Sequence, residues 1–206
     1  MNKPADSMSK VQKLTLLALL TAIVVVLQLL GSFIRFGNFS VSLVLVPIVI
    51  GAALLGVGAG GWLGLVFGVA VLLSGDAAGF LGISVPGTLI TVLAKGTLAG
   101  LAAGAVYRLI EKKNTLAATI AAAVVCPMVN TGVFLIGCFT FFFKAISEMA
   151  AGAGQDVFAF IIFVFVGGNF IFELLFNVVL APVILRIVDV GKKMISRRAG
   201  GVPPRA

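Results

Sequence analysis

Residues 14–30 read LTLLALLTAIVVVLQLL, and this stretch decides the class of fold. Only Thr15, Thr21 and Gln28 interrupt the apolar run, which approaches the roughly 20 helical residues needed to cross a bilayer. The whole chain of 206 residues is 61% hydrophobic and 11% charged, whereas soluble domains are about 25% charged. So short a chain cannot bury this much apolar surface away from water. We therefore expect an integral membrane protein, which excludes a soluble enzyme and a nucleic-acid-binding protein.

Further apolar runs follow along the chain, and together they predict an all-α bundle of six transmembrane helices. The second and third runs are short, so a single bent span is the alternative. We favour two helices because Gly58, Gly60 and Gly61 allow a tight reversal of the chain. One membrane domain is expected over residues 1–196, followed by a flexible basic tail over 197–206. The expected spans are residues 10–31, 42–56, 59–74, 86–110, 115–143 and 157–190.

The distribution of charge predicts the orientation of the bundle. If the N-terminus lies in the cytoplasm, Arg35 and Lys144 are the only outer members of the 15 Lys and Arg, and Lys95 lies within the membrane. The other basic residues flank the inner ends of the spans, as the positive-inside rule requires. An odd number of spans would place the basic C-terminal tail outside. The charges therefore favour six spans with both termini in the cytoplasm.

Glycines recur at every fourth position in the third and fourth expected helices. They occupy positions 60, 64 and 68 in one helix and positions 96, 100 and 104 in the other. A stripe of small residues lets a neighbouring helix backbone approach closely. We expect both stripes to serve packing within the bundle.

Two ionisable residues, Lys95 and Glu173, fall inside the expected spans. A charged side chain within a membrane is costly, so it is by default a candidate functional group. Other polar residues share the helical faces of these two, or lie in the fifth span just after Pro127: they are Thr88, Thr91, Asn130, Asn169 and Asn177.

Polar groups offered by three helices at a similar depth predict a binding pocket that opens toward the outer face. Its candidate residues within the spans are Thr88, Thr91, Lys95, Asn130, Asn169 and Glu173. Asn169 is the firmer member of the sixth helix, because Glu173 and Asn177 lie deeper. The alternative is structural: Lys95 and Glu173 form a buried ion pair, and the asparagines bridge helices.

The sequence offers no catalytic chemistry. It has no His, and its two cysteines, Cys126 and Cys138, share one expected helix. They would lie about 18 Å apart along that helix, too far for a disulfide. It also contains no phosphate-binding loop, no cluster of metal ligands and no nucleophile motif. We expect no enzyme activity, metal or cofactor, and no energy-supplying domain within the chain.

Four segments carry a resemblance to a known family. They are residues 13–22 (KLTLLALLTA), 39–52 (FSVSLVLVPIVIGA), 56–64 (GVGAGGWLG) and 95–104 (KGTLAGLAAG). With six short spans and no soluble domain, this order of segments resembles the substrate-binding S component of energy-coupling-factor (ECF) transporters, which are bacterial vitamin importers. The resemblance covers nearly the whole chain and implies a multi-pass protein of the bacterial cell membrane.

The resemblance also implies partners and a site. In that family, two alanines of the first helix, here Ala18 and Ala22, pack on a transmembrane T component, and two ABC-type ATPases complete the complex. Substrate binds toward the outer face, between the loop after the first helix and the fourth to sixth helices. This plan adds Asn38 and Phe39, in the loop over residues 32–42, to the candidates already named.

The substrate expected from these features is a small water-soluble vitamin or related metabolite. An ammonium at Lys95 suits a ligand that carries a carboxylate or phosphate. Pantothenate fits this chemistry, and residues 39–64 resemble the pantothenate- and riboflavin-type branch of the family. Riboflavin comes second, because a flavin would have to stack on phenylalanines such as Phe33, Phe36 and Phe80.

Two other functions stay open on the sequence alone. A self-sufficient ion-coupled carrier would use Glu173 to carry a proton. A structural subunit or assembly factor would need Lys95 and Glu173 only as a pair. The binding subunit is favoured, because it alone accounts for both a polar pocket and a missing energy module.

Overall fold

The structure is a computed structural model that describes residues 8–33, 35–36, 39–40, 43–163 and 168–199. The described chain is helical apart from two short strands. Five stretches are long and apolar enough to cross a membrane, and α2 is an additional apolar helix that is shorter. The long helices are α1 (Lys10–Phe33), α3 (Val57–Ser74), α5 (Val85–Ile110), α6 (Thr115–Gly137) and α9 (Gly168–Ala199), and α2 spans Leu45–Leu55.

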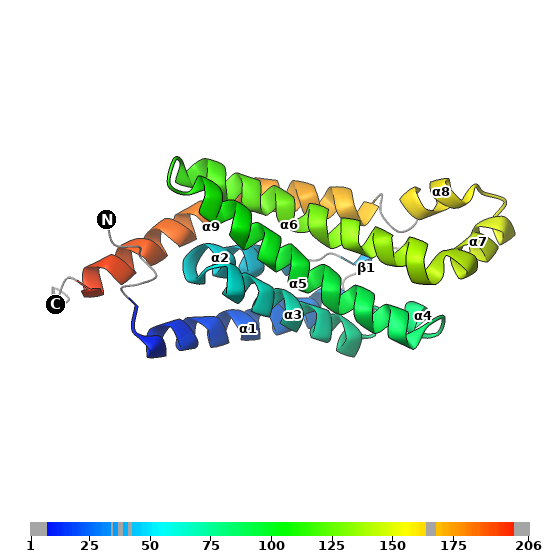
Figure 1. The fold of residues 1–206 in the computed structure, drawn as a ribbon, viewed down its shortest axis with the longest axis horizontal. Coiled ribbons are helices and arrows are strands. Elements are labelled where there is room, and N and C mark those ends of the chain that lie inside the picture. The colour runs from blue at the N-terminus through cyan, green and yellow to red at the C-terminus, as the bar shows by residue number, and fades with distance from the viewer. Residues whose placement is uncertain (1–7, 34, 37–38, 41–42, 164–167, 200–206) are drawn as a thin grey trace.

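The short elements gather at one end of the bundle. Strands β1 (Arg35–Phe36) and β2 (Phe39–Ser40) pair antiparallel after α1. Helices α4 (Ala78–Leu81), α7 (Phe143–Gly152) and α8 (Val157–Phe160) lie toward the same end (Figure 1). The start of α1, the α2–α3 turn, the α5–α6 turn and the end of α9 lie at the opposite end (Figure 1).

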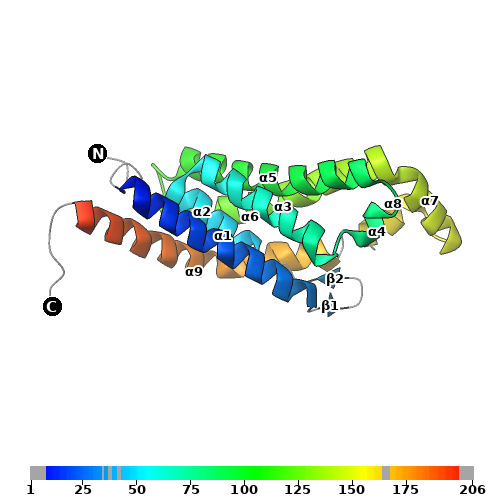
Figure 2. The ribbon, with the colours of Figure 1, turned by 90° about the horizontal axis from the view of Figure 1, so that it is seen from below.

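Helix α2 lies at the centre of the bundle, although it is the shortest of the six main helices. It contacts α1, α3, α5, α6 and α9. Nine of its 11 residues are buried, among them Ile48 and Val49 with no exposed surface. Burial on all sides explains why its sequence is apolar all round instead of amphipathic. In the view of Figure 2, α5 and α9 lie on opposite sides of the bundle.

The reversal between α2 and α3 occurs earlier than the sequence suggested. Gly56 makes the turn, with a φ of 104° that a residue with a side chain would rarely adopt. Gly58, Gly60 and Gly61 do not form the expected reversal, because they already belong to α3. Of these, Gly60 serves a different purpose, since it lies directly against the backbone of α5 at Gly100.

Helices α3 and α5 pack through their glycines along most of their length. A methyl group added at Gly60 would collide with the carbonyl oxygen of Gly100, and one at Gly64 with that of Gly96. Further along, Gly68 faces the carbonyl oxygen of Val92. Both predicted stripes therefore serve contacts within the bundle, and they bring two backbones closer than side chains would permit.

The helix that begins at Thr115 runs further than the expected span of 115–143. From α6 it passes through a π-helical segment, Cys138–Phe142, into α7, so that one apolar stretch covers Thr115–Gly152. Lys144 and Glu148 end the apolar run in the sequence, but the helix continues past them. Their side chains are exposed on one face of α7, while Ile146 and Ala150 are buried on the other. An amphipathic helix can continue in this way, because its apolar face keeps packing after its polar face reaches water.

The structure describes the last expected span, 157–190, in two parts. The first is α8 with the π-helical residues 161–163 after it, and the second is the long helix α9, Gly168–Ala199; residues 164–167 lie outside the described chain. The first residues of the expected flexible tail, 197–199, are helical, and residues 200–206 lie outside the described part of the chain.

Helices α5 and α6 begin with capping residues. The Ser84 side chain accepts a hydrogen bond from the amide of Gly87, and the Asn114 side chain accepts one from the amide of Ala117.

Candidate binding site between α3, α5, α6 and α9

Lys95 lies on α5 with its ammonium between aromatic rings of two neighbouring helices. Its Nζ atom is 5.8 Å from the ring centroid of Phe67 on α3 and 5.4 Å from that of Phe134 on α6. A cation is attracted to the face of an aromatic ring, and the attraction grows where water is excluded. Three helices thus join to hold one positive charge inside the bundle.

Glu173 is the second ionisable residue inside the bundle and lies on α9. Its side chain is buried, with 3% of its surface exposed. Because Lys95 and Glu173 carry opposite charges, the two side chains attract each other. Glu173 is therefore a further candidate member of the site around Lys95.

Three buried polar atoms around this site have no hydrogen-bond partner among the residues that the structure describes. They are Oγ1 of Thr91, Oδ1 of Asn130 and Oδ1 of Asn177. Their residues are 3%, 5% and 0% exposed, respectively. A buried polar atom without a partner costs free energy, so native proteins retain few of them without a reason. A bound ligand that completes these hydrogen bonds is such a reason.

The position of Thr91 depends on a glycine of the facing helix. A methyl group at Gly137 would collide with the Thr91 side chain, so α6 leaves space for Thr91 at this point. Thr91 lies one helical turn from Lys95 on α5, and Asn130 lies one turn from Phe134 on α6. The unpartnered oxygens of Thr91 and Asn130 therefore lie on either side of the level at which Lys95 and Phe134 meet.

Residues 12–185 match the family described as "ECF transporter, substrate-specific component". The chain belongs to this family. The match runs from the first turn of α1 into the second half of α9 and includes every residue of the site described above. Neither the curated proteins nor the solved structures gave a match. Substrate-specific components, or S components, are the substrate-binding membrane subunits of transporters and not enzymes, and they work with a T component and ATPases.

The structure brings together only some of the residues that the sequence predicts for the site of this S component. Lys95 lies near Phe134, and Thr91 and Asn130 lie one helical turn from these two residues on α5 and α6. Glu173 is buried on α9. Thr88 is buried, but its hydroxyl donates to the carbonyl oxygen of Ser84 over 2.7 Å within its own helix. Its proton is therefore already used in α5, so Thr88 can offer a ligand only an acceptor.

The remaining predicted residues have no described side chain. Asn38 lies outside the described residues, and for Phe39, in β2, and Asn169, in α9, the structure gives the backbone only. The two predicted partner-contact residues of this S component, Ala18 and Ala22, are both exposed on α1. Exposure of this face is what a contact with another membrane subunit requires.

Sequence reasoning missed the aromatic residues that surround Lys95. Phe67 stands in a uniformly apolar helix, so no pattern singles it out. Phe134 lies one turn after Asn130, and that spacing was the available signal. Phe80, expected as a stacking residue, packs on Phe134 at 5.5 Å and on Phe142 at 5.0 Å between ring centroids. Helix α4 thus extends the aromatic wall around Lys95 by a further layer.

A second polar cluster connects α1 to the region just after α3. The Gln28 amide nitrogen donates to the Asp76 carboxylate over 2.7 Å, and the Ser74 hydroxyl donates to the same oxygen over 3.2 Å. Gln28 is 5% exposed, so this is a partly buried contact between elements far apart in sequence. The cluster therefore holds the Asp76 carboxylate against α1 and the end of α3.

Proposed function

We propose that this S component captures a small water-soluble vitamin or related metabolite at the outer face of a bacterial cell membrane. Pantothenate, whose carboxylate suits the Lys95 ammonium, is the first candidate ligand. Riboflavin, which carries neither a carboxylate nor a phosphate, is the second and would not use that charge. ATP-driven uptake then proceeds through a T component and two ABC-type ATPases. The observation that carries this proposal is the Lys95 ammonium held between Phe67 and Phe134 beside unpartnered polar atoms.

Each polar group of the site could bind one chemical group of the ligand. An anionic group can make a charge-assisted hydrogen bond to Lys95, which is stronger than a neutral one. The Asn130 oxygen can only accept, so it favours a ligand with a hydroxyl or amide hydrogen nearby. The Thr91 hydroxyl can donate or accept. Pantothenate has a carboxylate, hydroxyls and an amide, and so satisfies all three.

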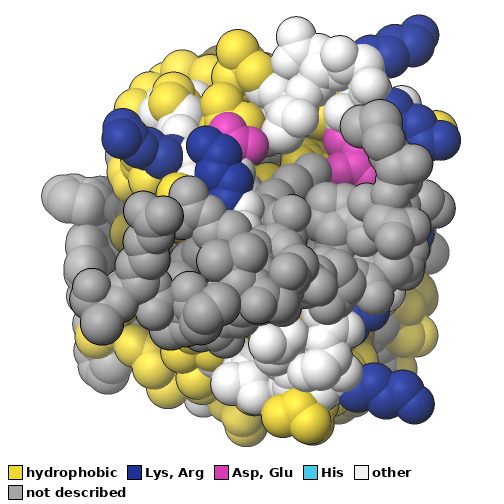
Figure 3. Space-filling view, turned by 90° about the vertical axis from the view of Figure 1, so that its left-hand side faces the viewer, with side chains coloured by type: hydrophobic (Ala, Val, Ile, Leu, Met, Phe, Trp, Pro, Cys, Tyr) yellow, Lys and Arg dark blue, Asp and Glu magenta, His cyan; other side chains and the backbone are white. Residues whose placement is uncertain are grey.

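The orientation proposed for the bundle follows from its charges. Figure 3 looks onto the end where α1 begins and α9 ends, and Lys and Arg side chains stand around that face. Lys10, Lys13, Arg108, Lys112 and Lys113 belong to this end. Under the positive-inside rule it faces the cytoplasm. The six main helices then leave both termini inside, and the end with β1, β2 and α4 faces outward.

The same orientation assigns a contact for the T component. Ala18 and Ala22 lie one turn apart on α1, near its cytoplasmic end, and both are exposed. Small side chains let another helix approach closely. We expect the T component to pack on this face of α1, which leaves the site around Lys95 free for substrate.

Direct titration tests this function. Purified chain in neutral detergent should bind pantothenate with heat or fluorescence changes that saturate at one ligand per chain. Lys95→Met should weaken that binding, whereas Lys113→Met, an exposed lysine at the α5–α6 turn, should not. A panel of riboflavin, thiamine and biotin ranks the alternatives. No saturable binding of pantothenate or of any other vitamin in this panel would contradict the proposal.

The alternative function, an ion-coupled carrier, predicts the opposite result for substrate uptake by reconstituted vesicles. Glu173 is buried on α9, as a proton-carrying group in a membrane would be. If it carries protons, vesicles that contain this chain alone take up substrate, and Glu173→Gln or a collapsed proton gradient stops the uptake. An S component in such vesicles binds substrate but takes none up until the T component and ATPases are added.

A further inference from the structure

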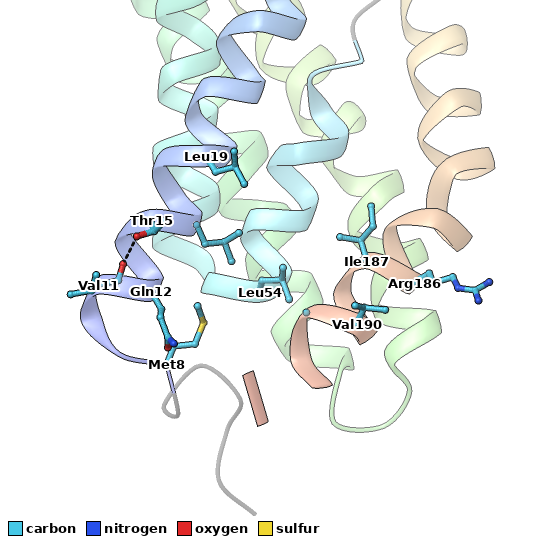
Figure 4. Close-up of a pocket in the computed structure, with 11 residues that line it drawn as sticks. Met8, Val11, Gln12, Thr15, Leu19, Leu54, Arg186, Ile187 and Val190 are labelled. Carbon is cyan, nitrogen blue, oxygen red and sulfur yellow. Dashed lines mark hydrogen bonds between the residues drawn. The ribbon is translucent and has the colours of Figure 1, made fainter. Parts of the chain in front are cut away.

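Two grooves flank the first half of α1. The larger, of about 760 Å³, lies between α1, the end of α2 and α9, and is lined mainly by apolar side chains such as Leu19, Leu54 and Ile187. Arg186 is the charged residue among those that line this groove, and Figure 4 shows its side chain extending away from the other labelled side chains. The larger groove therefore has apolar walls without a charge directed into it.

The smaller groove, of about 440 Å³, lies on the other side of α1, against α3. Leu14 and Leu17 form one wall, and Leu55 and Trp62 contribute to the other. Lys10 and Lys13 also line it. This groove combines an apolar interior with two cations from the first turn of α1.

The charged and apolar parts of the smaller groove are separated along α1. Lys10 lies in the first turn of the helix, at the basic end of the bundle. Trp62 lies further along, and its indole nitrogen donates to the Thr21 hydroxyl over 3.2 Å. Lys10 and Thr21 are about 16 Å apart along the helix axis. The groove thus carries its two charges at the basic end of the bundle and an aromatic ring further along α1.

Neither lysine uses its charge elsewhere in the described chain. The ammonium groups of Lys10 and Lys13 have no hydrogen bond or ion pair with any residue that the structure describes. The two residues are three positions apart, so they lie on the same side of α1. Two cations without a partner in the described chain, at the mouth of an apolar groove, complement a ligand with an anionic head and a hydrocarbon chain.

We propose that the groove between α1 and α3 binds one anionic phospholipid from the cytoplasmic leaflet. Lys10 and Lys13 hold its phosphate, and one acyl chain lies along Leu14 and Leu17 toward Trp62. Basic pockets between transmembrane helices on the cytoplasmic side are suited to anionic head groups. The leaflet follows from the orientation proposed above, whereas the lipid site itself is independent of the transported substrate.

Two pairs of variants test separately how the lysine charges and the shape of the groove contribute to lipid binding. Lys10→Gln with Lys13→Gln removes both cations, and Lys112→Gln with Lys113→Gln removes the same charge at the same end of the bundle but away from the groove. Gly58 lines the groove, and a Cβ atom added there would meet no atom within 4 Å. Gly58→Phe therefore adds a bulky ring at the groove and leaves every charge unchanged, while Gly132→Ala, at a glycine whose added Cβ is equally free of contacts, is its control.

Native mass spectrometry of the full chain in neutral detergent measures the outcome. We expect one phosphatidylglycerol per chain to bind more tightly than phosphatidylcholine with the same acyl chains. Loss of both groove lysines should weaken phosphatidylglycerol binding about 25-fold, at roughly fivefold for each lysine. Lys112→Gln with Lys113→Gln should leave it unchanged, and Gly58→Phe should abolish it. Glycerol phosphate, which has no acyl chain, should not compete.

Three results would overturn the lipid site. The first is equal binding of the two lipids, and the second is an equal loss in both lysine pairs, which would mean a general surface charge effect. The third is a Gly58→Phe chain that still binds the lipid but no longer retains the T component, which would make the groove a protein contact. Vitamin binding, measured on the same samples, reports separately on the proposed transport function.

Discussion

Lys95 is the residue on which the proposed binding site depends. Its ammonium lies 5.8 Å from the ring centroid of Phe67 and 5.4 Å from that of Phe134, inside the bundle. Lys95→Met keeps the apolar stem and removes the charge. A hydrogen bond to a charged group contributes about 1.5–3 kcal/mol, so an anionic ligand should bind about 10- to 150-fold more weakly. Calorimetric titration measures this, and unchanged affinity would remove Lys95 from the site.

Thr91 and Asn130 allow a test in which stability and binding move in opposite directions. Thr91→Val keeps the shape of the side chain but removes an oxygen that has no partner within the described chain. The ligand-free protein should therefore gain about 1 kcal/mol of stability, while the ligand loses a hydrogen bond. Asn130→Leu should act in the same sense. Thermal unfolding in detergent and ligand titration measure the two effects.

Thr97→Val is the matched control for Thr91→Val. Its hydroxyl, on the same helix, already donates to the carbonyl oxygen of Leu93 over 2.7 Å. This substitution should not raise stability and should leave binding intact. If Thr91→Val instead destabilises the ligand-free chain, its hydroxyl has a structural partner, and the interpretation as a ligand contact fails.

At the scale of elements, the contact between α3 and α5 is the least tolerant feature of the bundle. Gly64→Ala places a methyl group against the carbonyl oxygen of Gly96, and the two backbones must separate to accept it. Overpacking of this kind costs about 1–3 kcal/mol, so the midpoint of thermal unfolding in detergent should fall clearly. Because α3 carries Phe67 and α5 carries Lys95, ligand affinity should fall as well.

The control for this glycine lies on α6. Gly132→Ala adds a methyl group that meets no atom within 4 Å, and alanine favours a helix over glycine by about 0.5–1 kcal/mol. Stability should therefore stay the same or rise. Equal losses in Gly64→Ala and Gly132→Ala would mean that the close approach of α3 and α5 does not limit stability.

Local sequence rules predicted the helices well where their signals were local. The fourth expected span begins at residue 86, and α5 begins one residue earlier, at Val85; the glycine stripes predicted close packing. The rules failed where a residue had two possible uses. The glycines at 58–61 suit a turn as well as a helix contact, and only the three-dimensional position of α5 decides between these uses. Likewise, α7 continues the helix because its apolar face finds a partner, which no local signal shows.

At the scale of the molecule, the polar residues of the site were predictable and its aromatic walls were not. A charge or an amide stands out in an apolar helix, so Lys95, Asn130 and Glu173 were accessible from sequence. Phe67 and Phe134 are two of the 17 phenylalanines of the chain, and nothing but their position relative to Lys95 distinguishes them. Asp76, which follows the third apolar run, is not among the candidate residues that the sequence predicts.

The orientation of the whole bundle can be tested by labelling. Replacing the buried Cys126 and Cys138 with serine leaves a chain without thiols, into which single cysteines are placed at Lys113 and Gln155. Both positions are exposed, at opposite ends of the bundle. In intact cells a membrane-impermeant maleimide should modify position 155 and reach position 113 only after permeabilisation. The reverse pattern would contradict cytoplasmic termini.

The central claim is that the Lys95 site holds a small anionic metabolite, and mass spectrometry of purified protein tests it most directly. The wild-type chain and Lys95→Met are purified side by side from cells, and the small molecules that each retains are extracted and identified. The account predicts one anionic vitamin-like compound at close to one per wild-type chain and little or none with Lys95→Met. An equal amount of the same compound in both samples, or a retained compound without an anionic group, would contradict it.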